Sequence, residues 1–466
     1  MPPGINGDEA AVGLNAASIS KTGSDSENRF LPLFTNSVNS PDWKQPMTIY
    51  ASALVFKIFG LSYLNLRLTS VAFVLFSALV IYFLIKELIN KKIALVGVII
   101  FLTTPIVMIQ SHLAMENIAS VPFVSLWLLM MARYTKRPNN KSILLAGVFL
   151  GSSIFSYLGM RLIAPVLGIM TVCYLYFLNK NKKSYLNNLK WFLLGSMPFV
   201  AVLLLSKFYY PGVLLGQFRP YKIEDYQSLI LPFISSFDLS FLFLKGDATP
   251  YHSTGKQGMF LLGSLPLFII GIIGIIRRAK PIWVFSLVGF FLVPLLFGMG
   301  STIYRASRLM ALTPFYILIA STGLYFITTL KNKLLRRGAV IAILLLIGLN
   351  FSDFLLDYWY QYPQRVRTEF AKPIHTTYER LSAQAKSRNL APYVEEYLFQ
   401  SYPGEEKFFQ LVYFPDGLPR WQREKKVPPK SVILTDLSKF LKEGVDVVRI
   451  GELDYYFIIN QTENEI

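Results

Sequence analysis

Residues 64–92, LNLRLTSVAFVLFSALVIYFLIKELINKK, decide the fold class of this chain. The run 64–86 is predominantly apolar, and a helix needs roughly 17–25 such residues to cross the ~30 Å hydrocarbon core of a bilayer. The run ends at Lys86, and Lys91 and Lys92 follow closely. This stretch therefore predicts a membrane-spanning helix that ends in a basic loop.

Nine further apolar runs of comparable length follow along the chain. Together with the first they predict an all-α polytopic membrane protein with about ten spans. The composition agrees, because 53% hydrophobic residues, 16% charged residues and a mean hydropathy of +0.43 are too apolar for an ordinary soluble chain of 466 residues. The predicted spans are 64–86, 93–110, 113–132, 142–157, 161–178, 189–208, 259–276, 281–298, 308–328 and 338–356.

Lysine and arginine cluster in five short loops that fall at every second turn of the chain. Such loops stay on the cytoplasmic side of a membrane. The alternation predicts a multi-pass protein of the cell (plasma) membrane in which 1–63, 209–258 and 357–466 face outward, with the active site on that extracytoplasmic side. The loops contain Lys86, Lys91 and Lys92; Arg133, Lys136, Arg137 and Lys141; Lys180, Lys182, Lys183 and Lys190; Arg277, Arg278 and Lys280; and Lys331, Lys333, Arg336 and Arg337.

The net charge of +18 does not indicate nucleic-acid binding, because most of the surplus lies in these loops, where it sets topology and meets anionic lipid headgroups. We expect a lipid bilayer as partner and no nucleic acid. The single cysteine, Cys173, excludes a disulfide within the chain. The histidines, His112, His252 and His375, lack ligand spacing, so no obligatory metal is predicted, while a divalent cation stays open as a cofactor.

The spans divide the chain into three predicted domains: an outer loop region (1–63), a helical body (64–356) and a small C-terminal α/β domain (357–466). In the last of these, a helical pattern covers 368–388. Short apolar runs of strand length follow it. These are QLVYF (410–414), SVILTD (431–436), VDVVRI (445–450) and DYYFII (454–459).

Adjacent carboxylates stand near the start of the first region, in GINGDEAAVGLNAASISKTG (4–23). Asp8 and Glu9 directly precede a helical pattern, and Asn6 with Glu9 supplies capping chemistry. Taken alone, the pair is an acidic first turn favoured by the helix dipole. Further along, Trp43 and Lys44 in SPDWKQPM precede an amphipathic helix that leads into the first span.

With these motifs the chain resembles the GT-C membrane glycosyltransferases that use polyprenyl-phosphate sugars, including the protein O-mannosyltransferases and the aminoarabinose transferases of lipid A. The resemblance runs from residue 3 to about 330. It rests on the order of the motifs and on their shared outward side. The elements are Asp8 and Glu9; Lys44, Pro46, Phe59 and Gly60; Arg67 at the next span; Glu116 in SHLAMENIAS; and Arg305, Arg308 and Pro314.

The resemblance implies transfer of a monosaccharide from a polyprenyl-phosphate donor to a lipid, glycan or protein acceptor, with inversion. A sugar on phosphate already has a good leaving group, so the enzyme must deprotonate the acceptor and stabilise charge on the phosphate. Asp8 is then the general base, and Glu9 supports it by binding the acceptor or orienting Asp8. Lys44, Arg305 and Arg308 form a phosphate clamp.

Four other residues are weaker members of the predicted site. The family usually has aspartate where this chain has Glu116, which could instead cap a helix. Arg161 stands at an outer membrane boundary, where an arginine commonly snorkels to the headgroups. Arg67 enters the first span, and His252 lies in an outer loop, where a histidine with satisfied hydrogen bonds is the common reading.

Two alternatives stay open. A transporter or flippase for a lipid-linked sugar would explain the many helices, but it would favour ionisable residues near the bilayer midplane and internal repeats, which this sequence lacks. A noncatalytic partner in envelope assembly, binding through its C-terminal domain, would not need the DE pair and its basic partners. The family also has a membrane helix before the DE loop, so we expect one to be missing ahead of MPPGINGDEA.

Overall fold

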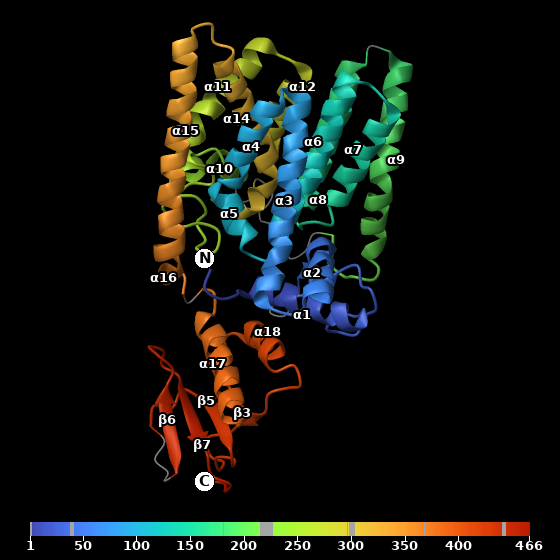
Figure 1. The fold of residues 1–466 in the computed structure, drawn as a ribbon. Helices are drawn as coiled ribbons and strands as arrows, with labels where there is room; N and C mark the ends of the chain where they lie inside the picture. Colours follow the sequence, from blue (N-terminus) through green and yellow to red (C-terminus); the bar gives the residue numbers. More distant parts are fainter. Residues whose placement is uncertain are drawn as a thin grey trace.

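The computed structural model of this chain has three parts: a bundle of long helices, a head at one end of the bundle, and a small sheet domain beyond the head (Figure 1). It describes residues 2–37, 42–179, 181–214, 227–295, 297, 303–367, 369–439 and 444–466. The predictions that fall on Lys180, on 215–226 of the outer loop, on 296 and 298 of the eighth span and on 368 of the C-terminal helix lie outside the described residues.

The head is built around two helices and a two-stranded antiparallel ladder. The first helix starts with a capping box, in which Asn6 Oδ1 accepts from the Glu9 amide at 3.0 Å and Glu9 Oε2 accepts from the Asn6 amide at 3.3 Å. It ends at Gly23, whose φ of 76° is cheap only for glycine. The elements are α1 Gly7–Thr22, β1 Thr35–Asn36, β2 Trp43–Lys44 and α2 Pro46–Phe59.

The helices of the body run along a common direction (Figure 1). Short 3-10 and π segments stand between several of them. The elements are α3 Tyr63–Leu88, α4 Lys91–Leu102, α5 Pro105–Ser111, η1 Glu116–Ala119, α6 Ser120–Lys136, α7 Asn140–Ser153, α8 Met160–Leu178, α9 Lys182–Ser206, α10 Gln227–Ser235, η2 Ser240–Leu244, η3 Leu262–Ser264, α11 Leu265–Arg278, α12 Pro281–Leu292, η4 Ala306–Leu312, α14 Thr313–Thr328, α15 Lys333–Leu356, η5 Asp357–Gln361 and α16 Tyr362–Arg365.

The number of full spans differs from the prediction. Among the described residues, six helices are long and apolar enough to cross a membrane, or seven if α4 and α5, bent by 64°, count as one span. This count is below the ten spans that the sequence predicts. The runs 142–157 and 259–276 form helices of only 14 residues, and the described helix in 281–298 has 12. Pro105 breaks the run 93–110, because proline disfavours helical backbone at the residue before it.

The bundle has the surface of a multi-pass membrane protein. The outer helices α9 and α15 leave most of their apolar side chains exposed, a surface that suits lipid rather than water. The turns α3–α4, α6–α7, α8–α9, α11–α12 and α14–α15 carry the basic loops. All five lie at the end of the bundle opposite the head and the sheet domain (Figure 1).

The C-terminal part is a five-stranded sheet with two helices, as the sequence predicts in outline. The strand order is β4-β3-β5-β7-β6, with β4, β3 and β5 parallel and the last two pairings antiparallel. QLVYF is not a strand: it continues a helix that starts at Pro403 and buries Phe408 and Phe409. The elements are α17 Lys372–Arg388, β3 Ala391–Glu395, α18 Pro403–Tyr413, β4 Arg420–Trp421, β5 Ser431–Thr435, β6 Val445–Arg449 and β7 Tyr456–Asn460.

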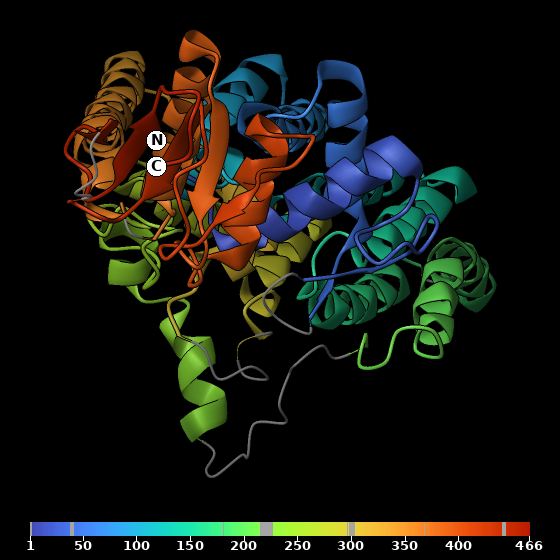
Figure 2. The same ribbon diagram turned by 90° about the horizontal axis from the view of Figure 1, so that it is seen from below.

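The sheet domain packs on the head through α18, which lies beside α1 (Figure 2). Buried apolar side chains of both parts, including Val12, Phe408 and Phe409, belong to one cluster. The contact is close: a Cβ added at Gly13 would meet the ring of Phe408 at 2.5 Å. The helix that carries the DE pair is thus held between the bundle and the C-terminal domain.

Candidate active site

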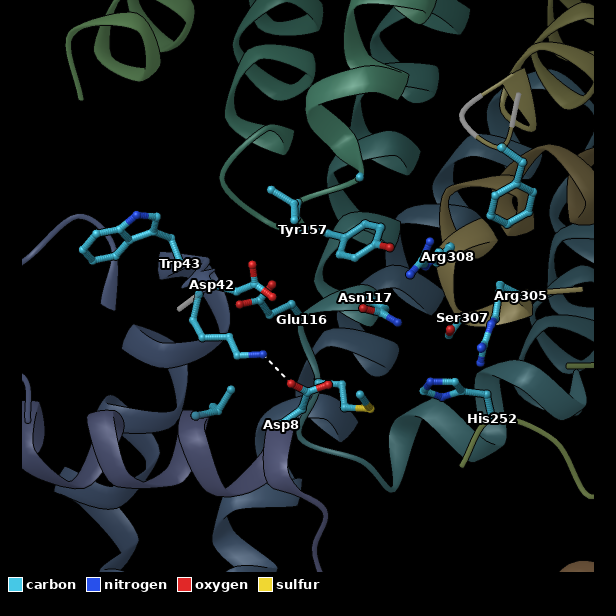
Figure 3. Close-up of a pocket in the computed structure, with 16 residues that line it drawn as sticks. Asp8, Asp42, Trp43, Glu116, Asn117, Tyr157, His252, Arg305, Ser307 and Arg308 are labelled. Carbon is cyan, nitrogen blue, oxygen red and sulfur yellow. Dashed lines mark hydrogen bonds and ion pairs between the residues drawn. The ribbon is translucent and has the colours of Figure 1, made fainter. Parts of the chain in front are cut away.

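A cavity of about 280 Å³ lies where the head meets the bundle (Figure 3). Several parts of the chain form it: the start of α1, β2, η1, the α7–α8 turn, the segments around 252 and 305–308, and Phe297. The lining residues are Asp8, Val12, Asp42, Trp43, Lys44, Met115, Glu116, Asn117, Tyr157, Leu158, Gly159, His252, Phe297, Arg305, Ser307 and Arg308. Six of the predicted site residues are among them: Asp8, Lys44, Glu116, His252, Arg305 and Arg308.

Asp8 and Lys44 form an ion pair in the cavity wall. Asp8 Oδ1 and Lys44 Nζ are 2.5 Å apart, and the Asp8 side chain is 53% exposed. Burial alone would raise the pKa of Asp8, but the ammonium group of Lys44 outweighs it and holds that pKa below its usual value. Burial likewise opposes the charge of Lys44, while Asp8 and Glu116 raise the pKa of the lysine. Asp8 is therefore held as a carboxylate.

Glu9 and Arg67 do not reach the cavity. The Glu9 carboxylate is fully buried and accepts hydrogen bonds from Arg67 Nε (2.9 Å), Arg67 Nη2 (3.0 Å) and the Ala114 amide (3.0 Å). Arg67 also donates to the carbonyl oxygens of Pro2 (3.1 Å) and Gly4. In this arrangement the pair fastens the start of α1 to the first span, while the neighbouring Asp8 faces the cavity.

Glu116 faces the cavity near Asp42 (Figure 3). Its Oε1 accepts from the backbone amide of Gln45 at 2.5 Å. Gln45 is the N-cap of α2, and its own side chain makes no capping bond. The predicted alternative was a cap on the helix of Glu116 itself; the observed bond instead satisfies the amide at the start of α2, and the Glu116 side chain still lines the cavity.

Arg161 is buried rather than snorkelling, with only 8% of it exposed. Its Nη2 donates to the side-chain oxygen of Gln45 at 2.7 Å and its Nη1 donates to the Val213 carbonyl. The guanidinium carbon also lies 5.1 Å from the ring centre of Phe34. Arg161 is outside the cavity lining and supports Gln45, whose amide donates to Glu116, and its burial does not fit the snorkelling alternative.

Arg305 and Arg308 lie on the side of the cavity away from the carboxylates (Figure 3). Asp247, which is almost fully buried, holds this segment. Its Oδ2 accepts from the Ser307 amide at 3.2 Å, and its Oδ1 lies 3.9 Å from Arg305 Nη1 and accepts from the Thr249 amide at 2.7 Å. The same aspartate thereby holds Arg305, the backbone at Ser307 and the loop that carries His252.

His252 lines the cavity, and its ring also lies within hydrogen-bond distance of another side chain of the protein. Only 8% of it is exposed, and its Nδ1 is 2.8 Å from Nε2 of the buried Gln110. Burial is the main reason that the pKa of His252 lies below its usual value; Arg305 and Arg308 add to this, while Asp247 and Asp8 oppose it. The ring is therefore neutral near pH 7.

Sequence reasoning missed several residues of this site. Tyr157 and Ser307 line the cavity, and Gln110 contacts the cavity residue His252. All three stand in apolar or loop sequence that carries no recognisable motif, so nothing in the sequence pointed to them. Asp42 could have been found, because it stands two residues before Lys44 in SPDWK. Within the described part of the chain, no three His, Cys, Asp or Glu side chains come close enough to hold a metal ion. The expected lack of an obligatory metal stays a prediction.

Comparison with known proteins bears on this geometry. Residues 40–210 match the family model described as dolichyl-phosphate-mannose-protein mannosyltransferase. The crystal structure of ArnT from Cupriavidus metallidurans in the apo state has a TM-score of 0.58 to this chain, and the match covers 98% of this chain and 94% of that one at 11% identity. The chain resembles the GT-C glycosyltransferases. In the family match and in its fold, the chain is thus similar to glycosyltransferases of the GT-C type.

Two further solved structures share the GT-C fold. ArnT of Cupriavidus metallidurans bound to undecaprenyl phosphate gives a TM-score of 0.54 at 11% identity, again over 98% of this chain and 94% of that one. The oligosaccharyltransferase of Archaeoglobus fulgidus, in complex with Zn and sulfate, gives 0.52 at 11% identity, over 88% of this chain and 58% of that longer one. Comparison with curated protein sequences gives no match. At such identities the likeness to solved structures establishes the fold.

Proposed function

We propose that this protein transfers a monosaccharide from a polyprenyl-phosphate donor to an acceptor hydroxyl or phosphate group on the outer face of the cell membrane, with inversion at the anomeric carbon. One observation carries the proposal. A single cavity has carboxylates on one side and two arginines on the other, as the acceptor and the donor phosphate require. The ArnT structure with undecaprenyl phosphate supports the donor class.

The reaction follows from these two sides. The acceptor oxygen attacks the anomeric carbon as Asp8 takes its proton, and the bond from that carbon to the phosphate oxygen breaks with its electrons on the phosphate. The donor is a phosphodiester with one negative charge, whereas the departing polyprenyl phosphate approaches two. Negative charge thus grows where Arg305 and Arg308 lie, and the arginines stabilise it more in the transition state than in the ground state.

Asp8 serves as the base because it is exposed to the cavity and ionised. Lys44 at 2.5 Å keeps its pKa low and fixes its direction. An ammonium group has three donors, so Lys44 keeps N–H groups beyond the one directed at Asp8 for a phosphate oxygen. The predicted part of Lys44 in binding phosphate stays part of this proposal. Glu116 and Asp42 offer further acceptors for the hydroxyl groups of the sugar or acceptor.

The outer-face orientation rests on the charges of the loops. The five basic turns lie at the end of the bundle away from the cavity, and such turns favour the cytoplasm. The ionisable cavity residues lie at an end of the bundle, beside the head, and not at its middle. This location favours transfer over transport of a lipid-linked sugar, for which midplane sites are typical.

The test is transfer of label by the purified protein in lipid vesicles. A panel of polyprenyl-phosphate sugars, each radiolabelled in the sugar, is incubated with candidate acceptors, and the label is followed into acceptor and into released polyprenyl phosphate. We expect wild type and Glu27→Gln, a change of an exposed head carboxylate outside the cavity, to transfer label, and Asp8→Asn to bind donor without transferring it. Label that crosses the bilayer still attached to its lipid would identify a flippase instead.

A further inference from the structure

Gln110 is brought to His252 by a break in the helix before it. Thr104, the residue before Pro105, is extended, and α5 leaves the direction of α4 by 64°. The short α5 then runs towards the cavity and carries Gln110, which is completely buried. Its side chain meets a loop 142 positions later in the chain, with Gln110 Nε2 2.8 Å from His252 Nδ1. The contact therefore depends on the tertiary fold alone.

This contact selects one form of the imidazole ring. With the amide oriented as in this structure, Gln110 Nε2 donates to His252 Nδ1, so the neutral ring carries its proton on Nε2, while Gln110 Oε1 is buried with no hydrogen-bond partner among the described residues. A proton on Nδ1 would face the amide N–H. The charged groups around the ring are Asp247 and Asp8, which favour the imidazolium, and Arg305 and Arg308, which oppose it, and burial adds to the effect of the arginines.

The ring of His252 belongs to the arginine side of the cavity. His252 lines the cavity, and its ring lies close to Arg305 (Figure 3). A neutral N–H donor adds a directed hydrogen bond to an anion without adding a third positive charge beside the two guanidinium groups. A phosphate oxygen bound between the arginines is the acceptor that suits this group, because charge-assisted hydrogen bonds are the stronger ones.

We propose that His252, held by Gln110 as the neutral ring protonated on Nε2, donates a hydrogen bond to a non-bridging oxygen of the donor phosphate. Gln110 acts through His252 and is a positioning residue. This proposal rests on the proposed function, because it takes the phosphate of the polyprenyl donor as the ligand of the arginine side. Charge grows on that phosphate as the sugar leaves, so the bond strengthens towards the transition state.

The test is nitrogen NMR of the full-length protein labelled with ¹⁵N-histidine in lipid nanodiscs. The chain has three histidines, and His112→Gln and His375→Gln remove the two signals that do not belong to His252. We expect unprotonated Nδ1 and protonated Nε2 in the protein alone. Adding undecaprenyl phosphate should shift the Nε2 signal of His252, whereas undecaprenol, which lacks the phosphate, should leave it in place, and His375 should not respond to either.

Two variants of Gln110 test the positioning role. Gln110→Glu replaces the donor by an acceptor, so Nδ1 should gain a proton and the nitrogen pattern should reverse or become that of an imidazolium, with a changed pH profile of kcat/KM. Gln110→Met keeps the length without a hydrogen bond and should weaken binding of undecaprenyl phosphate by about ten- to a hundredfold, the worth of a hydrogen bond to a charged group. Gln257→Met, a buried glutamine that bonds to Asp353 and Asn350 instead, is the control.

The outcomes separate this inference from the proposed function. If undecaprenyl phosphate binds and the His252 nitrogens do not shift, the histidine proposal is overturned while the transferase stands. A proton on Nδ1 in the wild-type protein also overturns it. If undecaprenyl phosphate and other polyprenyl phosphates fail to bind at all, the proposed function falls and this inference with it. The measurement on the wild-type protein decides the matter even where a Gln110 variant does not fold.

Discussion

Glu9→Gln separates a stabilising role of this carboxylate from the catalytic one that the sequence predicted. The buried Glu9 oxygens accept four hydrogen bonds, from Arg67 Nε (2.9 Å) and Nη2 (3.0 Å) and from the amides of Ala114 (3.0 Å) and Asn6 (3.3 Å). Glutamine keeps the shape, but it has one accepting oxygen and no charge to balance Arg67. Removing one partner of a buried ion pair costs about 3–5 kcal/mol. At 1.4 kcal/mol per tenfold, the unfolding equilibrium should change by about 10²- to 10⁴-fold.

The assay compares unfolding with transfer. Reversible unfolding in mixed micelles gives the loss of free energy, and the transfer rate is measured where the variant is still fully folded. We expect Glu9→Gln to lose stability while transfer by the folded protein changes little. The double variant Glu9→Leu/Arg67→Met should cost less than the two single changes added together, because it leaves no unpaired buried charge.

One result would refute this reasoning. If Glu9→Gln unfolds like the wild-type protein and its transfer falls a hundredfold or more, Glu9 acts in the chemistry as the sequence first suggested. The ion pair with Arg67 would then be worth little.

Three further results are expected. Asp8→Asn should lower the transfer rate by about 10²- to 10⁴-fold, which is the usual contribution of a general base, and should leave the free energy of unfolding unchanged. Near-normal turnover would mean that Asp8 only favours the first turn of its helix. Lys44→Met removes the cation that lowers the pKa of Asp8, so that pKa rises and the acid limb of the kcat/KM profile moves to higher pH; an unmoved limb contradicts Asp8 as the base. Arg305→Ala and Arg308→Ala should each weaken donor binding by about ten- to a hundredfold, against Arg133→Ala at the opposite end of the bundle as control, and unchanged affinity in both would leave the clamp unsupported.

The order of the helices could be predicted from the sequence, but their lengths could not. Apolar runs locate every long helix of the body. An apolar run does not reveal where a helix stops, however, as at Pro105 and at the turn after α7, where the chain leaves the helix to supply Tyr157 to the cavity. QLVYF shows the same limit, because a five-residue apolar run fits a strand and the buried end of a helix equally well.

The sequence allowed us to predict which residues belong to the site, but it did not allow us to predict how they lie relative to one another. Asp8 and Glu9 are neighbours on one helix, and adjacent helical residues point in directions about 100° apart. The sequence does not tell which of the two faces the cavity, and the resemblance assigned both to the site. The bond between Gln110 and His252 joins positions 142 residues apart, and no local pattern could have predicted it.

The close contact between Gly13 and Phe408 couples the C-terminal domain to the helix that carries Asp8. α1 begins with the proposed base and, less than two turns later, rests on the ring of Phe408, while Glu9 ties its start to the bundle. The arginines belong to the bundle alone. Two contacts therefore set the distance between Asp8 and the arginines, across which a sugar must fit: the ion pair of Glu9 and the packing on Phe408. A change in how the sheet domain docks on α1 would alter that distance without changing any residue that lines the cavity.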